Sequence, residues 1–415
     1  AAGIAGRVQP PDGNHLEESG GDGGMKFTEY VEVNPKTNLK KGEYAPFVEM
    51  ANVSITYREP EKIEYKKYTS GPKFQNGDSV VARIEPCLQN GKRFFWKSDK
   101  IGFGSTEYIV FRAKEGKMDS KYLFYLLKTD YIKKSMVSSM VGATGRQRVN
   151  NDIFGQIEIV VPNIEKQKKI GRTLFLYDDL IENNQKQIKL LEEAAQRLYK
   201  EWFVDLRFPG HENTKIVDGV PEGWNESTVE SFGTVITGKT PPTSNKEYYT
   251  NGKVPFVTIP DMHNVVYPLK TEKRLTIEGA QTQKNKYIPP NSVMISCIGT
   301  VGLVCIATEV CQTNQQINSI ILNNEDDLYF FYESMLRMKD LLDGLGSNGA
   351  TMTNVNKSKL EKLIIISPSK DIVKQYNDVC KPLFESALNL SRKNVYLKNM
   401  REALLPKLMS GEVEV

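Results

Sequence analysis

The sequence VNNDIFGQIEIVVP, at residues 149–162, aligns without a gap with VNKSKLEKLIIISP, at residues 355–368. The two copies are offset by 206 residues, and a Gly-Ala-Thr tripeptide precedes each of them, at 142–144 and at 349–351. This offset is far longer than the period of solenoid repeats, which is roughly 20 to 50 residues. The repeat therefore indicates a duplicated domain, and it predicts two similar surfaces that recognise two sites.

The composition is typical of a globular protein whose 415 residues are long enough for roughly two or three domains. Five cysteines without a C-x-x-C spacing and three histidines (His15, His211 and His263) predict neither a disulfide framework nor a zinc site. Free cysteines are usual in a reducing compartment, so we expect a cytoplasmic protein. The longest apolar run, Ser292–Ala307, is interrupted by glycine and threonine, and it predicts two buried strands rather than a membrane span.

Charge is distributed unevenly between the two copies. Residues 25–162 contain 23 lysine and arginine residues against 16 acidic ones, a net charge of +7. Residues 222–368 contain 13 against 15, a net charge of −2. We therefore expect that the first copy can bind a polyanion unaided, and that the second needs polar contacts or a partner.

Each copy combines short runs typical of β-strands with one helical stretch, at residues 120–137 and 326–342. This pattern predicts an α+β fold in which two similar globular domains are joined by two long helices. The expected segments are a disordered leader at 1–24, a first recognition domain at 25–162, a central coiled-coil helix at 163–207, a linker at 208–221, a second recognition domain at 222–368 and a C-terminal coiled-coil helix at 369–415.

Apolar residues follow a spacing of seven after each copy, as in a coiled coil. We expect the two helices to pack antiparallel on each other, because a globular domain lies between them; packing of each helix on its own domain is the alternative. The 38 residues from 165 to 202 would span about 57 Å at about 1.5 Å per residue. The predicted seam residues are Leu174, Ile181, Asn184, Ile188, Leu191, Leu198, Trp202, Leu383, Leu390, Leu397 and Leu404.

Residues 233–240 match the phosphate-binding pattern G-x-x-x-x-G-K-[ST]. A working P-loop requires a helix that begins directly after the lysine and threonine. Here Pro241 and Pro242 follow at once and indicate an extended loop. We therefore expect Lys239 and Thr240 to contact a phosphate backbone, and an NTPase is a minor alternative.

Two loops of the first copy have side chains suited to DNA. Residues 142–148 include Arg146, Gln147 and Arg148, and arginine and glutamine form bidentate hydrogen bonds with guanine and adenine. A solvated basic loop is the alternative. Residues 92–96 interleave basic and aromatic side chains, which fits either DNA contact or a hairpin whose aromatic residues point inward.

The corresponding loop of the second copy, residues 346–354, is amide-rich but uncharged, and residues 311–318 contain five amide side chains. We find no credible catalytic triad and no metal-ligand cluster, so the sequence favours a binding protein that is not an enzyme. The predicted DNA-contacting residues are Lys36, Lys40, Lys92, Arg93, Ser105, Thr106, Thr144, Arg146, Gln147, Arg148, Lys239, Thr240, Ser244, Lys246, Gln312, Asn314, Gln315, Ser347, Asn348 and Thr351.

Several strings together resemble the specificity subunit of type I restriction-modification enzymes, over about residues 27–415. The first copy departs from the pattern, since it lacks the Pro-Glu-Gly-Trp sequence that precedes the second. The strings that carry the resemblance are LYKEWFVDLRFPG (198–210), VPEGW (220–224), GKTP (238–241), NQQIN (314–318) and LLPKLMSGEV (404–413).

The resemblance implies that each recognition domain reads one half of a bipartite, asymmetric site in double-stranded DNA. It also implies that the coiled coil sets the spacer and docks two methyltransferase (M) subunits, which two restriction/translocase (R) subunits join. This chain would then bind no cofactor: S-adenosylmethionine would belong to the M subunits, and ATP and magnesium to the R subunits. The alternative is a coiled-coil interaction scaffold that does not bind DNA.

Overall fold

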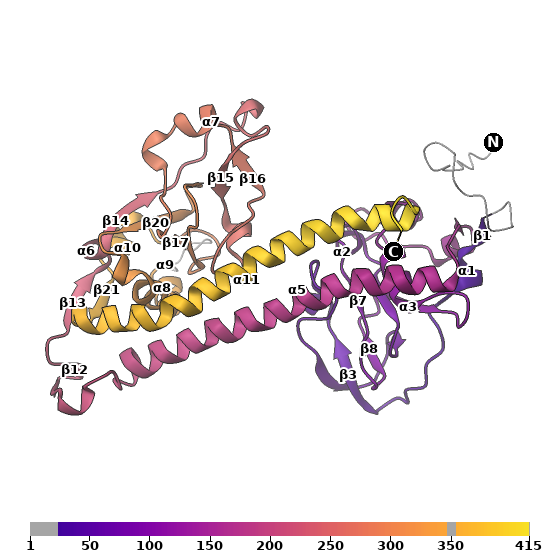
Figure 1. The fold of residues 1–415 in the computed structure, drawn as a ribbon, viewed down its shortest axis with the longest axis horizontal. Coiled ribbons are helices and arrows are strands. Elements are labelled where there is room, and N and C mark those ends of the chain that lie inside the picture. The colour runs from indigo at the N-terminus through magenta and orange to yellow at the C-terminus, as the bar shows by residue number, and fades with distance from the viewer. Residues whose placement is uncertain (1–23, 347–353, 415) are drawn as a thin grey trace. The chain divides into compact units, whose positions relative to one another are not determined.

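The computed structural model describes residues 24–346 and 354–414, which fall into two compact units (Figure 1). Unit 1 comprises residues up to Asn183 together with those from Tyr396 onward, and unit 2 comprises Asn184–Val395. The division falls inside two long helices, α5 (Ile164–Tyr199) and α11 (Lys370–Ser410). Except for Gly24, the predicted leader lies outside the described residues.

Unit 1 contains two four-stranded sheets and one strand pair. In the first sheet all neighbours are antiparallel, and in the second β3 and β8 are parallel. The first sheet has the order β2 (Val31–Val33), β9 (Tyr108–Ala113), β6 (Ser79–Ala82) and β7 (Arg93–Phe95). The second has the order β4 (Glu64–Lys67), β3 (Tyr44–Val48), β8 (Gly102–Gly104) and β5 (Lys73–Phe74), and the pair joins β1 (Met25–Lys26) to β10 (Glu158–Ile159).

Unit 2 repeats this topology with two differences among the described residues: it lacks a counterpart of β5, and it has an additional strand pair, β11 (Ile216–Val217) with β12 (Val220–Pro221). Its first sheet has the order β14 (Gly233–Thr237), β20 (Ile317–Leu322), β17 (Val293–Ser296) and β18 (Val304–Ile306). Its second has the order β16 (Lys273–Leu275), β15 (Val254–Val257) and β19 (Gln312–Thr313), and here β15 and β19 are parallel. The remaining pair joins β13 (Asn225–Thr228) to β21 (Ile364–Ser367).

Each of the two predicted helical stretches is a pair of shorter helices. The first is α3 (Ser120–Leu126) followed by α4 (Asp130–Ser138), and the second is α8 (Leu328–Arg337) followed by α9 (Lys339–Gly346). The remaining short helices are α1 (Phe27–Tyr30), α2 (Glu85–Gln89), α6 (Val229–Phe232), α7 (Ile277–Gln281) and α10 (Lys357–Glu361). The mixture of helices and strands in two repeated units confirms the predicted α+β fold.

The repeated segments, residues 149–162 and 355–368, have the same role in both units. Asn150 and Asn356 cap a short helical turn, at Asn151–Gly155 and at α10, by accepting a hydrogen bond from a backbone N–H. A strand follows each turn and pairs with the first strand of its domain. In the first domain that strand, β1, has only two residues, where its counterpart β13 has four.

The long helices are part of the domain cores. In unit 1, Leu174 and Phe175 of α5 and Leu408 of α11 pack in the same buried cluster as the sheet residues. In unit 2, Tyr199 of α5 and Phe384 of α11 do the same. Mutual packing of the helices and packing on the nearby domain, which the heptads presented as alternatives, therefore occur together within each unit.

The two helices are antiparallel within each unit. In unit 2 the Asn184 Nδ2 donates a hydrogen bond to the Asn394 Oδ1 at 2.9 Å, and the Tyr376 hydroxyl donates one to the Ala195 carbonyl at 3.3 Å. In unit 1, Arg401 of α11 forms a buried ion pair with Asp178 of α5. Of the predicted seam residues on α5, those buried are Leu174, Ile181, Asn184 and Ile188, and those half-buried are Leu191 and Leu198. Trp202, also half-buried, lies in the π-helical turn Lys200–Val204 that follows α5.

The predicted leucine stripe of α11 lies at the edge of its packed face. All four leucines are half-buried: Leu383, Leu390, Leu397 and Leu404. The centre of the packed face is formed by other residues, which are Cys380, Phe384, Ala387, Asn394, Arg401, Leu405 and Leu408. The polar members of this line are tolerated because Asn184 and Asp178 of α5 satisfy them.

Gly171 of α5 has a packing role, although glycine inside a helix lowers helix stability. A Cβ atom at this position would come within 2.8 Å of the Tyr122 backbone nitrogen and 2.7 Å of the Asp119 carboxylate. The glycine therefore lets the N-terminal end of α3 approach the backbone of α5.

We predict that Glu333→Gln makes the chain more resistant to heat above pH 8 and changes little at pH 5. Glu333 of α8 is 2% exposed, and burial raises its pKa to about 8. Because the unfolded-state pKa is about 4.3, the folded state holds an extra proton, and stability falls as the pH rises from about 5 through about 8. Glutamine carries no charge, so it should remove this loss.

Thermal unfolding followed by circular dichroism between pH 5 and pH 9 measures this effect. A difference of about 1 kcal/mol would shift the melting temperature by roughly 2–4 °C. Glu226 of β13 is exposed, and Glu226→Gln is the matched control, which should keep the native pH dependence. The same pH dependence in Glu333→Gln as in the native chain would contradict the prediction.

Candidate nucleic-acid interface

In unit 1, Arg148 lies where the loop of residues 142–148 rejoins the first sheet. Its backbone forms isolated bridges with Val141 and with Ile84, which follows β6. The Arg83 N–H donates to the Glu107 carbonyl at 2.8 Å, and the Val149 N–H donates to the Arg83 carbonyl at 3.0 Å. The loop and the β8–β9 turn, which contains Ser105 and Thr106, are therefore held side by side.

A carboxylate joins these two predicted DNA-contacting segments. The Arg148 guanidinium donates to both carboxylate oxygens of Glu107, at distances of 2.8 to 3.0 Å. This hydrogen bonding raises the pKa of Arg148 above its ordinary value. The Gly145 N–H donates to the Glu85 carboxylate at 2.8 Å. Sequence reasoning missed both glutamates, because 41 and 60 residues separate them from their partners; aligning the two copies across the β8–β9 turn would have drawn attention to Glu107.

Unit 2 builds the same frame with uncharged side chains. Ile298 and Asn354 form an isolated bridge, the Cys297 N–H donates to the Gln316 carbonyl at 2.7 Å, and the Val355 N–H donates to the Cys297 carbonyl at 2.9 Å. Asn354 therefore occupies the position of Arg148 in unit 1, and Gln316 that of Glu107. The ion pair of the first domain is replaced by two amides in the second.

The structure also joins two other segments predicted to contact DNA. The Thr240 hydroxyl donates to the Gln315 Oε1 at 2.6 Å, and the Lys239 N–H donates to the Thr313 carbonyl at 2.9 Å. A Cβ atom on Gly238 would lie 2.2 Å from the Asn314 carbonyl oxygen, so this glycine permits close backbone packing. The segment continues as loop after Thr240, which leaves it without the helix that a P-loop requires.

The sequence predicts that Arg93 and Gln312 contact DNA, but both are buried, so the prediction of a surface contact is wrong for them. Arg93 is buried, its Nη1 donates to the Leu127 carbonyl at 2.6 Å, and burial lowers its pKa to about 10. Gln312 is 0% exposed and donates to the Ala280 carbonyl at 3.0 Å. Both side chains satisfy buried carbonyl groups. Lys92 is half-buried, and its Nζ donates to the Met50 carbonyl at 2.7 Å, so it too is occupied within the domain.

The other predicted contacts are accessible or lie outside the described residues. Ser105, Gln147, Thr240 and Asn314 are half-buried. The exposed positions are Lys36, Lys40, Thr106, Thr144, Arg146, Arg148, Lys239, Ser244, Lys246 and Gln315. Ser347, Asn348 and Thr351 lie outside the residues that the structure describes.

The charged residues behind the net charge of −2 in the second domain are distributed unevenly along its sequence. Residues 239–288, which include β15, β16 and α7, contain eight basic and four acidic residues. The rest of 222–368 contains five basic and eleven acidic residues. The segment that includes Lys239, Ser244 and Lys246 is therefore basic, which favours the attraction of a polyanion to this part of the second domain.

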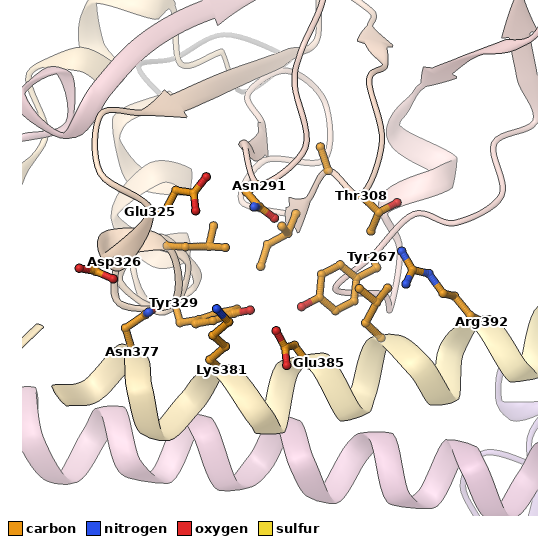
Figure 2. A pocket seen from close by; sticks show the side chains of 14 residues that line it. Tyr267, Asn291, Thr308, Glu325, Asp326, Tyr329, Asn377, Lys381, Glu385 and Arg392 are labelled. Carbon is orange, nitrogen blue, oxygen red and sulfur yellow. The ribbon is translucent and has the colours of Figure 1, made fainter. Parts of the chain in front are cut away.

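A second surface feature of unit 2 is a pocket of about 300 Å³ against α11 (Figure 2). Asn377, Lys381 and Glu385 point from α11 toward it, and Asn291 and Thr308 line the opposite wall. Asn377 is only 6% exposed, and its buried Oδ1 has no hydrogen-bond partner among the described residues. None of the predicted DNA-contacting residues lines this pocket.

Within residues 24–346 and 354–414, no cluster of three or more histidine, cysteine, aspartate or glutamate side chains could hold a metal ion. Among the same residues, no helix has both the length and the apolar character needed to cross a membrane.

Comparison with known proteins identifies relatives over most of the chain. A family model described as the type I restriction modification DNA specificity domain matches twice, over residues 31–193 and 221–395. The chain is 33% identical to the type I restriction enzyme HindI specificity subunit of Haemophilus influenzae, covering 82% of this chain and 87% of that protein. It is 29% identical to the MjaIX specificity subunit of Methanocaldococcus jannaschii, covering 71% and 69%.

Among solved structures, the fold is similar to the S subunit of a type I restriction-modification system from M. genitalium. The TM-score is 0.58 at 15% identity, and the match covers 93% of this chain and 95% of that one. At this identity the likeness shows the fold alone. The two matches of the family model fall on the two copies that the internal repeat defines.

We predict that Arg148→Ala weakens the binding of duplex DNA roughly tenfold, or about 1.4 kcal/mol. The substitution removes a cation and leaves the Glu107 carboxylate without its partner at the surface, where it would repel phosphates. The double variant Arg148→Ala/Glu107→Ala should recover part of the loss. Fluorescence anisotropy titrations at two salt concentrations measure all three proteins.

Asn354→Ala provides the matched control at the equivalent position of unit 2. Because it removes no charge, its effect on affinity should not depend on salt. If the double variant binds no better than Arg148→Ala, Glu107 does not act through repulsion.

Proposed function

We propose the function of this chain from one premise: it belongs to the family of type I restriction-modification DNA specificity proteins. Members of this family are non-catalytic recognition subunits, so the chain supplies DNA specificity and is not an enzyme. We propose that it recognises a bipartite, asymmetric DNA site, with one half contacted by each globular domain.

The main support for this proposal is that the two domains attach their loops by equivalent backbone contacts but have different side chains at the attachment points. The Arg148–Glu107 ion pair of the first domain and the Asn354 and Gln316 amides of the second occupy the same positions on the same backbone scaffold. Two surfaces of one shape but different hydrogen-bonding character suit two different half-sites, because base edges are distinguished by their pattern of donors and acceptors. Identical side chains would suit a palindromic site.

The proposed DNA contacts divide by chemistry. We propose that the exposed lysines Lys36, Lys40, Lys239 and Lys246 contact phosphates and set the register. The base-reading side chains would be those of the adjoining loops. In the first domain these are Ser105, Thr106, Thr144, Arg146, Gln147 and Arg148, and in the second Thr240, Ser244, Asn314, Gln315, Ser347, Asn348 and Thr351.

We propose the segments 25–162 and 222–368 as the recognition domains, 163–207 and 369–415 as the helical segments, and 208–221 as the linker. The 36 residues of α5 correspond to about 54 Å of helix at about 1.5 Å per residue. A stiff element of this length could set the spacer between half-sites. Two M subunits that carry S-adenosylmethionine, and two R subunits that use ATP and magnesium, would join this chain on DNA in the cytoplasm.

Docking of a methyltransferase subunit on α11 is supported by the pocket in unit 2. Lys381, Glu385 and Arg392 line it and form no ion pair among the residues that the structure describes. The buried Oδ1 of Asn377 also lacks a donor there. Unpaired charges and an unsatisfied amide at one site suit a partner that supplies the complementary groups.

We predict that exchanging residues 222–368 for the corresponding segment of another family member changes one half of the methylated target. Each domain has its own core, so the exchange leaves the first frame intact. Methylome sequencing of cells that express the chimera with a methyltransferase partner reads both halves and the spacer. A change in both halves, or in neither, would overturn the modular assignment; an active complex without any split motif would favour the scaffold alternative.

We also predict that Lys381→Glu weakens assembly with the methyltransferase subunit at least tenfold, while DNA binding by the chain alone is unchanged. Reversal of a charge at a docking surface replaces attraction by repulsion. Analytical ultracentrifugation or calorimetry of the two proteins measures assembly. Lys393→Glu, on an exposed position of α11 outside the pocket lining, is the matched control. Equal assembly of both variants would remove the pocket from the docking surface.

A further inference from the structure

Two tyrosines and two lysines form a cluster on the second sheet of unit 1, and its members are Tyr44, Tyr65, Lys67 and Lys100. Tyr44 of β3 is 69% exposed and Tyr65 of β4 is 57% exposed. Tyr44 pairs in register with Lys67, and the Lys67 Nζ lies 5.6 Å from the centre of the Tyr44 ring. The Lys100 Nζ lies 5.2 Å from the centre of the Tyr65 ring. Because Tyr65 and Lys67 are two residues apart on one strand, all four side chains belong to the same face.

The two lysines of this tyrosine–lysine cluster have no carboxylate partner. Within the described residues, neither Lys67 nor Lys100 forms an ion pair, although both are exposed. By contrast, the neighbouring Lys62 and Lys66 share Glu64, at 3.1 and 2.8 Å. The rings hold the two ammonium groups in place without neutralising them. The cluster is therefore a positioned, unneutralised pair of cations.

The strand register places this cluster relative to the base-reading loop. Val48 of β3 is level with Gly104 of β8, and Ser105 follows immediately. Tyr44 is four residues earlier on β3, about 13 Å away at about 3.3 Å per residue. If the duplex axis runs along β3, that distance corresponds to about four base pairs, because a duplex rises about 3.4 Å per base pair.

We propose that the tyrosine–lysine cluster binds the sugar–phosphate backbone of duplex DNA about four base pairs from the bases that the Ser105 and Arg148 loops contact. It contributes affinity and no sequence selectivity, because lysines aimed at phosphates do not read base edges. In the second domain Tyr249 and Tyr287 are half-buried and pack against the cluster formed by Val254, Phe256, Leu275 and Ala280, so they do not form the same exposed arrangement. The inference rests on the proposed DNA-binding function.

The test is the salt dependence of binding by the full chain. Binding of a duplex of unrelated sequence is titrated over a range of potassium chloride concentrations, with the native chain and with Lys67→Ala/Lys100→Ala. Each lost phosphate contact lowers the slope of log K against log salt by about 0.9, so the expected decrease is about 1.8. The target selected from randomised duplexes should stay the same, and hydroxyl-radical protection should be lost about four base pairs from the read bases.

Two further variants separate this role from others. Lys67→Arg/Lys100→Arg keeps the charge and should keep the native slope. Lys186→Ala/Lys189→Ala removes two exposed lysines of α5 and should also leave the slope unchanged. Melting curves matching that of the native chain establish that the variants are folded.

An unchanged slope in Lys67→Ala/Lys100→Ala would overturn the inference. If that variant also aggregates, the role of the lysines is to protect the edge strand β4 from pairing with other chains. A changed target sequence would overturn it too, because the cluster would then read bases. If the native chain binds no duplex at all, the failure is that of the proposed function itself.

Discussion

Each globular domain completes its hydrophobic core with side chains from the two long helices, and the rest of the structure depends on this sharing. In unit 1, Phe175 of α5 meets Phe95 of β7 with ring centres 4.9 Å apart, and the Arg58 guanidinium lies 4.3 Å from the centre of the same ring. In unit 2, Tyr199 of α5 packs against Phe330 of α8 and Tyr376 of α11. Aromatic side chains bury large areas, so their contacts dominate such cores. A domain of this kind cannot turn on its helices without opening its own core.

Buried polar pairs then select one register for the helices. Asp178 accepts hydrogen bonds from both Tyr125 and Arg401, and Asn184 and Asn394 bond to each other. A shift of either helix would leave these groups buried without partners, at a cost of roughly 1–3 kcal/mol for each neutral group and more for a charged one. Apolar contacts alone would tolerate sliding. The polar pairs therefore specify the alignment more strictly than the leucines do.

The sequence allowed the repeated frame and the long helices to be predicted, because both depend on periodic patterns that continue over many residues. The centre of the α11 face could not be predicted in this way. Its buried line passes through Asn394 and Arg401, whereas a pattern of apolar heptads selects the neighbouring leucine stripe. The burial of Arg93 and Gln312 could not be predicted from the sequence for a related reason. Their partners are the carbonyl groups of Leu127 and Ala280, and only the tertiary fold brings those groups near.

The backbone attaches each loop and the side chains determine its surface, which explains how one scaffold can present two different surfaces. In both domains the loop is attached by main-chain hydrogen bonds, from Val149 to Arg83 and from Val355 to Cys297, which do not depend on side-chain identity. The side chains at the attachment point, Arg148 and Asn354, are left free to differ. Substitutions at these two positions change the side chain presented at the surface, while the main-chain hydrogen bonds that hold the loop stay intact. A duplicated domain with this property can change one of its two surfaces at little cost in stability, since Arg148 and Asn354 lie outside the buried clusters of both domains.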